Sequence, residues 1–154
     1  MKLQTDFSKI LDKQLFQVLK KTVEELNVKA FVIGGFVRDA VLGREQKKDI
    51  DIVVLGSGID LAKALQKKLV EARPVQVFKT YGTAMMHWEG VDLEFVGARK
   101  ESYSPDSRNP KVTPGSLIED QNRRDFTINT LAISLNKADL GAFIDPFNGL
   151  KDLE

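Results

Sequence analysis

The chain has 154 residues, of which 42% are hydrophobic and 29% charged, and this composition is ordinary for a single globular domain with a real core. Its net charge of +1 gives no overall affinity for nucleic acid, so contacts of that kind must come from local patches such as residues 44–48 or 123–124. The absence of cysteine excludes disulfides, thiolate metal sites and cysteine nucleophiles. No apolar run approaches the roughly 18–20 residues of a membrane span, and the amino terminus lacks a signal-peptide pattern. We therefore expect a cytoplasmic protein without a membrane partner.

Apolar residues recur at helical spacing within residues 1–27. They are Ile10, Leu11, Leu15, Val18, Leu19, Val23 and Leu26. This spacing predicts an amphipathic helix of about five turns. It should end near Asn27, a residue type that tolerates the left-handed backbone of a helix end. Residues 30–33 then predict a short buried strand, which Gly34-Gly35 breaks before a short helix that carries Arg38.

A basic loop leads to a second strand, which begins with Asp49 and Asp51. Side chains at i and i+2 of a strand share one face, with Cα atoms roughly 6.5–7 Å apart. The apolar neighbours at 50 and 52–54 indicate a buried strand, where carboxylates are costly unless they are paired or bind a cation. Because Mg²⁺ is typically held by one or two carboxylates with waters and substrate phosphates, the pair indicates metal-assisted phosphoryl chemistry. The alternative is a solvated strand edge matched by the preceding lysines.

Gly34-Gly35 would let the backbone approach a ligand closely, since glycine adopts positive φ. The helix that follows offers free N–H groups to an anion. Arg38, one turn later, can bind a phosphate through two parallel hydrogen bonds. Two alternatives stay open, namely a plain strand-to-helix turn and a surface ion pair of Arg38 with Asp39 or Glu45.

The middle of the chain predicts a helix and three strands. A turn at residues 56–58 opens a second amphipathic helix, which Arg73-Pro74 ends. The strand candidates are residues 75–78, 83–88 and 91–96. The tight turn Glu89-Gly90 predicts that the last two form an antiparallel hairpin.

The strand over residues 91–96 supplies a candidate third carboxylate. Alternation places Val91, Leu93 and Phe95 on one face and Asp92, Glu94 and Val96 on the other. If this strand neighbours the one that begins at Asp49, then Glu94 or Asp92 joins the same acidic cluster. The sequence leaves open which of the two does so.

Residues 97–115 contain three prolines and no periodicity, which predicts a long, mobile loop. Order returns with a helix that begins near Asp125 or Thr127, followed by strands over residues 132–135 and 142–145. Together these elements predict an α+β fold, with two helices packed on a small mixed sheet of about five strands.

Two further polar groups have competing interpretations. Asp125 is either the N-cap of the predicted helix or a ligand of a ribose hydroxyl, with Arg124 on a phosphate. His87 is the only histidine and lies in a strand beside Trp88. We expect it to be packed or exposed rather than catalytic.

Three ordered stretches resemble the motifs of class II tRNA nucleotidyltransferases and bacterial poly(A) polymerases. The first comprises GGFVRD at 34–39, LG at 42–43 and DID at 49–51; the second is RRDFTIN at 123–129; the third, a hinge motif, is DPFNGLKDL at 145–153. The resemblance covers the chain from about Val28 onward. It implies the catalytic head domain of the polymerase β-like nucleotidyltransferase superfamily.

The resemblance also implies a role for each candidate residue. Asp49 and Asp51 would be Mg²⁺ ligands in a two-metal site, with Glu94 as the third acidic residue. The nucleotide-binding residues would be Gly34 and Gly35 at the turn, Arg38 on the triphosphate, Arg124 on the nucleotide and Asp125 on the ribose 2′-hydroxyl. Residues 97–115 would correspond to a flexible element used during nucleotide addition.

The implied reaction is attack of an RNA 3′-hydroxyl on the α-phosphate of ATP or CTP, with tRNA 3′-CCA addition as the leading expectation. A poly(A) polymerase of the same family and a non-catalytic nucleotide-binding module are the alternatives. The family's base-templating Glu-Asp and Arg motif and its helical RNA-binding domains do not occur in residues 1–154. We therefore expect residues 1–154 to be the head domain of a longer protein.

Overall fold

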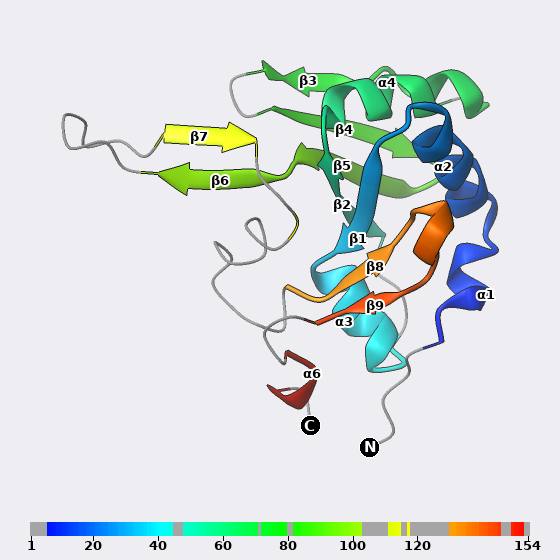
Figure 1. Ribbon diagram of the computed structural model, residues 1–154. Helices are drawn as coiled ribbons and strands as arrows, with labels where there is room; N and C mark the ends of the chain where they lie inside the picture. Colours follow the sequence, from blue (N-terminus) through cyan, green and yellow to red (C-terminus); the bar gives the residue numbers. More distant parts are fainter. Residues whose placement is uncertain are drawn as a thin grey trace.

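The computed structural model describes residues 6–44, 48–70, 72–79, 82–102, 111–114, 117, 130–145 and 149–152 (Figure 1). The helices are α1 (Ser8–Leu11), α2 (Gln14–Glu25), α3 (Gly35–Val41), α4 (Gly58–Lys68), the 3-10 turn η3 (Lys137–Asp139) and α6 (Gly149–Asp152). The strands are β1 (Lys29–Ile33), β2 (Asp49–Leu55), β3 (Gln76–Phe78), β4 (Thr83–Trp88), β5 (Val91–Gly97), β6 (Arg99–Ser102), β7 (Lys111–Pro114), β8 (Ala132–Ser134) and β9 (Phe143–Ile144).

Seven strands form one mixed sheet in the order β3-β4-β5-β2-β1-β8-β9. The pairing of β2 with β5 is parallel, and the other pairings in this sheet are antiparallel. The predicted α+β class and mixed sheet are confirmed, although the expected number of about five strands was too small. The predicted hairpin at Glu89-Gly90 is also confirmed, with both residues at positive φ, 47° and 79°, as a tight two-residue turn requires.

The helices α2, α3 and α4 pack against one face of the sheet and enclose the main core with it. On β2 this face carries Ile50, Ile52 and Val54, and on β5 it carries Leu93 and Phe95, all of them buried. Figure 1 shows α2 and α4 lying next to each other against the sheet, and Lys68 of α4 forms an ion pair with Glu25 of α2. The opposite face has a smaller apolar cluster, centred on Phe31, Ile33, Val53 and Ala132.

The prediction of a single helix before Asn27 is wrong in one respect. The chain forms two helices, because Lys13 takes an extended conformation with φ −61° and ψ 146° and begins α2 anew. The predicted end is confirmed, since Asn27 has the left-handed φ of 52°. Apolar spacing continues across residues 12 and 13, and for this reason the sequence pattern does not reveal the break.

The predicted loop over residues 97–115 is also wrong in part. The strands β6 and β7 pair antiparallel in a separate two-stranded sheet, with Lys100 opposite Thr113. Figure 1 shows this pair, here called the arm, extending away from the seven-stranded sheet. Residues 103–110 lie outside the described part of the chain. Among the residues that are described, no helix has the length and apolarity to cross a bilayer.

Candidate active site

The strand β2 presents Asp49 and Asp51 on the face of the sheet opposite α2, α3 and α4. Their alternate neighbours Ile50 and Ile52 are buried in the main core, so the two aspartates point to the other side. Asp49 is exposed and Asp51 is half-buried. The predicted position of this pair at the start of a buried strand is confirmed.

The parallel pairing of β5 with β2 adds two more carboxylates to this face. In the register, Asp92 lies opposite Asp49, and Glu94 lies opposite Asp51. Neighbouring strands are about 4.8 Å apart, and residues in register share a face of the sheet. Asp49, Asp51, Asp92 and Glu94 thus form a two-by-two group, called here the acidic face.

The two candidates for the third acidic residue differ in their surroundings. The Oδ1 atom of Asp92 lies 2.7 Å from Nδ1 of His87, and the side chains are 56% and 36% exposed. Glu94 is half-buried and stands beside Asp51, deeper along β2. Both carboxylates lie on the acidic face; the role of Glu94 as the third acidic residue, which the resemblance implies, stays a prediction.

Gly34 lies against Asp51. The residue ends β1 with φ +81° and ψ −147°, a conformation that is essentially restricted to glycine. A Cβ atom at Gly34 would lie 3.2 Å from Oδ2 of Asp51. Because β1 and β2 are antiparallel, with Ile33 opposite Asp51, the glycine turn lies at the same end of the sheet as the aspartates. Gly35 then opens α3.

Arg38 lies in α3, and its backbone N–H donates to the carbonyl of Gly34 over 3.1 Å. Its Nε lies 3.3 Å from Oδ1 of Asp39, whose side chain is almost fully buried, while the Arg38 side chain is 23% exposed. The ion pair that we considered as an alternative is therefore present. It uses one of the five N–H donors of the guanidinium, so the pair with Asp39 is compatible with a second role for Arg38 toward a phosphate.

The other two motifs are described only in part. Arg124 and Asp125 lie outside the described residues, and so does the helix predicted to begin there. In the third motif, Oδ1 of Asp145 accepts a hydrogen bond from the backbone N–H of Gly149 over 2.6 Å. Asp145 therefore fastens the start of α6, a contact that is structural.

The acidic face offers ligands of the right chemistry for Mg²⁺. Carboxylate oxygens are the hard ligands that this ion prefers, and it is usually completed by substrate phosphates and water. Within the residues that the structure describes, no three Asp, Glu or His side chains converge as a closed metal cage would require. The glycine at position 34 leaves the space next to Asp51 that a larger residue would fill. The residues therefore fit an ion shared with a substrate better than a permanent structural metal.

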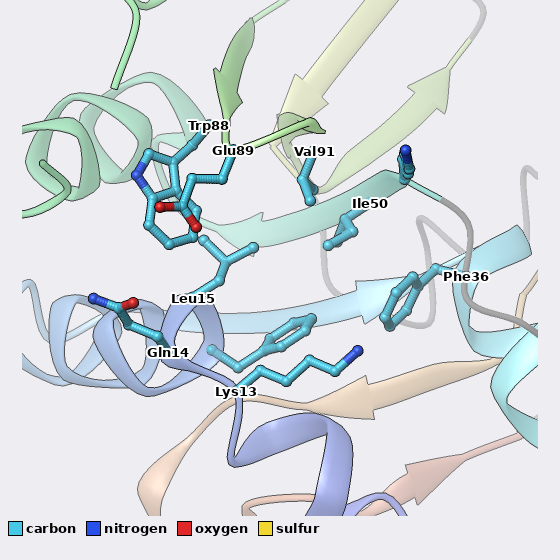
Figure 2. A pocket seen from close by; sticks show the side chains of 10 residues that line it. Lys13, Gln14, Leu15, Phe36, Ile50, Trp88, Glu89 and Val91 are labelled. Carbon is cyan, nitrogen blue, oxygen red and sulfur yellow. The ribbon is translucent and has the colours of Figure 1, made fainter. Parts of the chain in front are cut away.

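A hollow of about 340 Å³ lies on the other side of β2 and is not part of this site. Figure 2 shows Ile50, Phe36, Val91 and Trp88 around it, with Lys13 extending along its edge toward Phe36. Ile50 points away from the acidic face, because side chains alternate along a strand. The hollow consequently has no access to Asp49 or Asp51 through the sheet.

The contact of His87 with Asp92 was missed by sequence reasoning. A signal for it was present, since a two-residue turn at Glu89-Gly90 pairs Trp88 with Val91 and His87 with Asp92. The expectation that His87 is packed or exposed agrees with its half-buried state.

The fold and the acidic face together resemble known tRNA nucleotidyltransferases. A solved CCA-adding enzyme in an apo form superposes with a TM-score of 0.81 at 34% identity, covering 99% of this chain and 37% of that one. A tRNA nucleotidyltransferase solved with a primer tRNA and an incoming ATP analog gives a TM-score of 0.74 at 41% identity, covering 88% of this chain and 36% of that one. The architecture is therefore that of a nucleotidyltransferase head.

The chain belongs to the poly A polymerase head domain family, whose pattern matches residues 30–154. It is 46% identical over 127 residues to the A-adding tRNA nucleotidyltransferase of Aquifex aeolicus, covering 82% of this chain and 15% of that protein. It is 37% identical over 124 residues to the CC-adding enzyme of Deinococcus radiodurans, covering 80% and 32%. The chain thus spans a third or less of the length of these two relatives.

Proposed function

We propose that the protein transfers nucleotides from ATP or CTP to the 3′-hydroxyl of RNA, with the 3′ end of tRNA as the acceptor. The observation that carries this proposal is the group of Asp49, Asp51 and Glu94 on one face of the sheet, beside a glycine turn, in a chain of this family. The names of the relatives add support, since they include A-adding, CC-adding and CCA-adding enzymes.

In this proposal Asp49 and Asp51 bind Mg²⁺, and Glu94 completes the acidic group. When bound in a two-metal arrangement, such ions lower the pKa of the attacking hydroxyl and neutralise charge on the phosphate oxygens. The chain's own contribution is to hold three carboxylates in register on two paired strands. A rigid sheet is well suited to this task, because its register fixes the relative positions of the side chains.

The nucleotide itself is proposed to lie toward α3. The backbone at Gly34 and Gly35 would approach the triphosphate, and the guanidinium of Arg38 would bind it. Arg124 would contact the nucleotide, and Asp125 would recognise the ribose 2′-hydroxyl. These four contacts orient the α-phosphate over the acidic face.

In the reaction, the oxygen of the acceptor 3′-hydroxyl forms a bond to the α-phosphorus of the nucleotide. The bond between the α-phosphorus and the oxygen that bridges to the β-phosphate breaks, and pyrophosphate leaves. The proton of the hydroxyl passes to solvent. No side-chain nucleophile is needed, and positioning with charge stabilisation supplies the acceleration.

The function is tested by incubating the protein with tRNA that lacks its terminal CCA, with Mg²⁺ and with CTP, ATP or both. We expect addition of a defined number of nucleotides, and the nucleotide that is used assigns an A-adding, CC-adding or CCA-adding activity. Long A tracts on unrelated RNA would instead assign the poly(A) polymerase activity that the family description suggests. No incorporation into either RNA would contradict the proposal.

A binding experiment distinguishes the proposal from a non-catalytic nucleotide-binding module. We expect ATP or CTP to bind more tightly with Mg²⁺ than with EDTA, and Arg38→Lys to weaken binding about tenfold, because lysine lacks the two-pronged donor geometry. The exposed Lys63→Ala on α4 serves as a control and should bind normally. Binding that ignores both Mg²⁺ and Arg38 would favour the non-catalytic module.

A further inference from the structure

A second hollow, of about 220 Å³, lies on the edge of the sheet next to the acidic face. Its lining includes Arg73, Gln76, Met85, His87 and Asp92. Pockets for drug-sized ligands occupy about 300–1,000 Å³, so this smaller hollow suits a single nucleoside unit. Of its lining residues, only Asp92 belongs to the acidic face.

The hollow is continuous with the candidate active site through the strand register. Along one row, Asp51 of β2 pairs with Glu94 of β5, and Glu94 pairs with Met85 of β4. Along the next row, Asp49 pairs with Asp92, and Asp92 pairs with His87. Each step is about 4.8 Å. The hollow therefore begins one strand away from the proposed metal ligands.

The geometry of phosphoryl transfer determines which substrate lies on the β5 and β4 side of the acidic face. The attacking and leaving oxygens of a phosphoryl transfer are roughly in line on opposite sides of the phosphorus. Gly34 and Arg38 lie beyond β2 on the β1 side, where the triphosphate and its leaving pyrophosphate are proposed to bind. The acceptor hydroxyl must then approach from the β5 and β4 side, which is where the hollow lies.

We propose, on the basis of the proposed function, that this hollow binds the 3′-terminal nucleotide of the acceptor RNA. The two charged ends of the hollow, Asp92 and Arg73, orient this nucleotide. Asp92 repels a phosphate but accepts hydrogen bonds from ribose hydroxyls, and Arg73 binds the phosphate that precedes the terminal nucleoside. The terminal ribose therefore lies at Asp92, next to Asp49, and the chain of the RNA leaves past Arg73.

The other lining residues suit a base and hold the two charges in place. Met85 is 37% exposed and offers a polarisable apolar surface to a base, and the amide of Gln76 can bond to a base edge. His87 holds one oxygen of Asp92 at 2.7 Å, which leaves the second oxygen to accept a 2′-hydroxyl. The backbone N–H of Arg73 donates to the carbonyl of His87 over 3.3 Å, and this bond fastens the segment that carries Arg73 to β4.

The test compares acceptor tRNAs whose terminal nucleotide carries either a 2′-hydroxyl or a 2′-deoxyribose, both with the 3′-hydroxyl retained. The unmodified protein should use the ribose end about tenfold better in kcat/KM, as expected for a hydrogen bond to a charged group. Asp92→Asn should use the two ends nearly equally, with the KM for the nucleotide unchanged. Asp60→Asn, an exposed aspartate on α4, is the matched control and should discriminate as the unmodified protein does.

A second variant tests the other end of the hollow. Arg73→Ala should raise the KM for tRNA about threefold to tenfold and reduce its salt dependence, as loss of one phosphate contact does, without changing the KM for the nucleotide. Incorporation that is indifferent to the terminal 2′-hydroxyl and to Arg73 would overturn this site while leaving the proposed function intact. Absence of incorporation by the unmodified protein would overturn both.

Discussion

At the scale of single residues, Gly34 and Asp51 depend on each other. The backbone of Gly34 has φ +81°, and the position where its Cβ would be lies 3.2 Å from Oδ2 of Asp51. The backbone conformation favours glycine there, and a Cβ would in addition press on the carboxylate of Asp51. The carboxylate owes its place to β2, whose register against β1 sets Asp51 opposite Ile33.

We predict that Gly34→Ala destabilises the protein and weakens nucleotide binding. A residue with a Cβ in this backbone region costs of order 1–3 kcal/mol, and its methyl group displaces Asp51. The loss of stability should appear in urea denaturation, and the loss of affinity in Mg²⁺-dependent ATP or CTP titration.

Gly90→Ala is the matched control for this prediction. Gly90 also has positive φ, +79°, but a Cβ there would meet nothing within 4 Å. Gly90→Ala should lower the free energy of unfolding by about 1–2 kcal/mol, because alanine is strained in this backbone conformation. Nucleotide binding should be unchanged. Equal nucleotide affinities in the two variants would show that the contact of Gly34 with Asp51 is unimportant.

At the scale of elements, the parallel pairing of β2 with β5 assembles the acidic face. The connection between these strands contains α4 and the strands β3 and β4. The first residue of α4, Gly58, packs directly on the backbone of β5, and a Cβ there would lie 3.0 Å from the carbonyl carbon of Phe95. The start of α4 is thus a close contact that sets the helix against the strand carrying Glu94.

We predict that Gly58→Ala destabilises the protein, against the usual trend for glycine in a helix. Replacement by alanine would ordinarily gain about 0.5–1 kcal/mol, but overpacking costs about 1–3 kcal/mol, and here the obstacle is backbone rather than a flexible side chain. A net loss of about 1–2 kcal/mol in urea denaturation is expected. The exposed Lys63→Ala in the same helix should stay within about 0.5 kcal/mol of the unmodified protein; a gain in stability for Gly58→Ala would contradict the prediction.

The arm can be shortened without changing the strands of the main sheet, because among the described residues β6 and β7 form a separate two-stranded sheet. Lys100 lies opposite Thr113, so an Asn-Gly turn can replace residues 101–112. We expect an unchanged melting temperature and unchanged Mg²⁺-nucleotide binding, with a slower rate of nucleotide addition to tRNA. An unaltered rate would show that addition does not use the arm.

At the scale of the whole molecule, the sheet separates stability from function. One face packs against α2, α3 and α4 and forms the main core, whereas the other presents four carboxylates in register. A strand with alternating character serves both purposes, as β2 does with Ile50 and Ile52 on one side and Asp49 and Asp51 on the other. The carboxylates of the acidic face are thereby carried by strands whose other side is buried in the main core.

Much of this arrangement could be predicted from local patterns in the sequence. The position of Asp49 and Asp51 follows from a period of two in β2, and the hairpin of β4 and β5 follows from Glu89-Gly90. The sequence did not predict that β5 pairs with β2, since these strands lie far apart in the chain. The acidic cluster could therefore be expected only if the two strands were neighbours. Local patterns carry no information on such a register, and therefore periodicity alone left open whether Asp92 or Glu94 lies beside the aspartates; the structure places both of them there.

The two wrong predictions, a loop over residues 97–115 and a single helix before Asn27, also have physical causes. The arm was missed because β6 and β7 form a sheet of their own, outside the seven-stranded sheet, so their sequences RKES and KVTP need no alternation of apolar residues. The break at Lys13 was missed because the apolar spacing of α1 continues into α2. In both cases the period of apolar residues, which is the main signal of secondary structure, reports burial rather than backbone conformation.

We propose that Asp51 and its neighbours drive nucleotide transfer to RNA, and this is tested most directly by the incorporation of labelled CTP and ATP into tRNA lacking CCA by Asp51→Asn. This change keeps the shape of the side chain and removes its charge, so we expect at least about a hundredfold loss of rate, with the circular dichroism spectrum and melting temperature of the folded protein retained. Asp60→Asn, which removes an exposed carboxylate from α4, should be fully active. Undiminished incorporation by a folded Asp51→Asn protein would contradict the account.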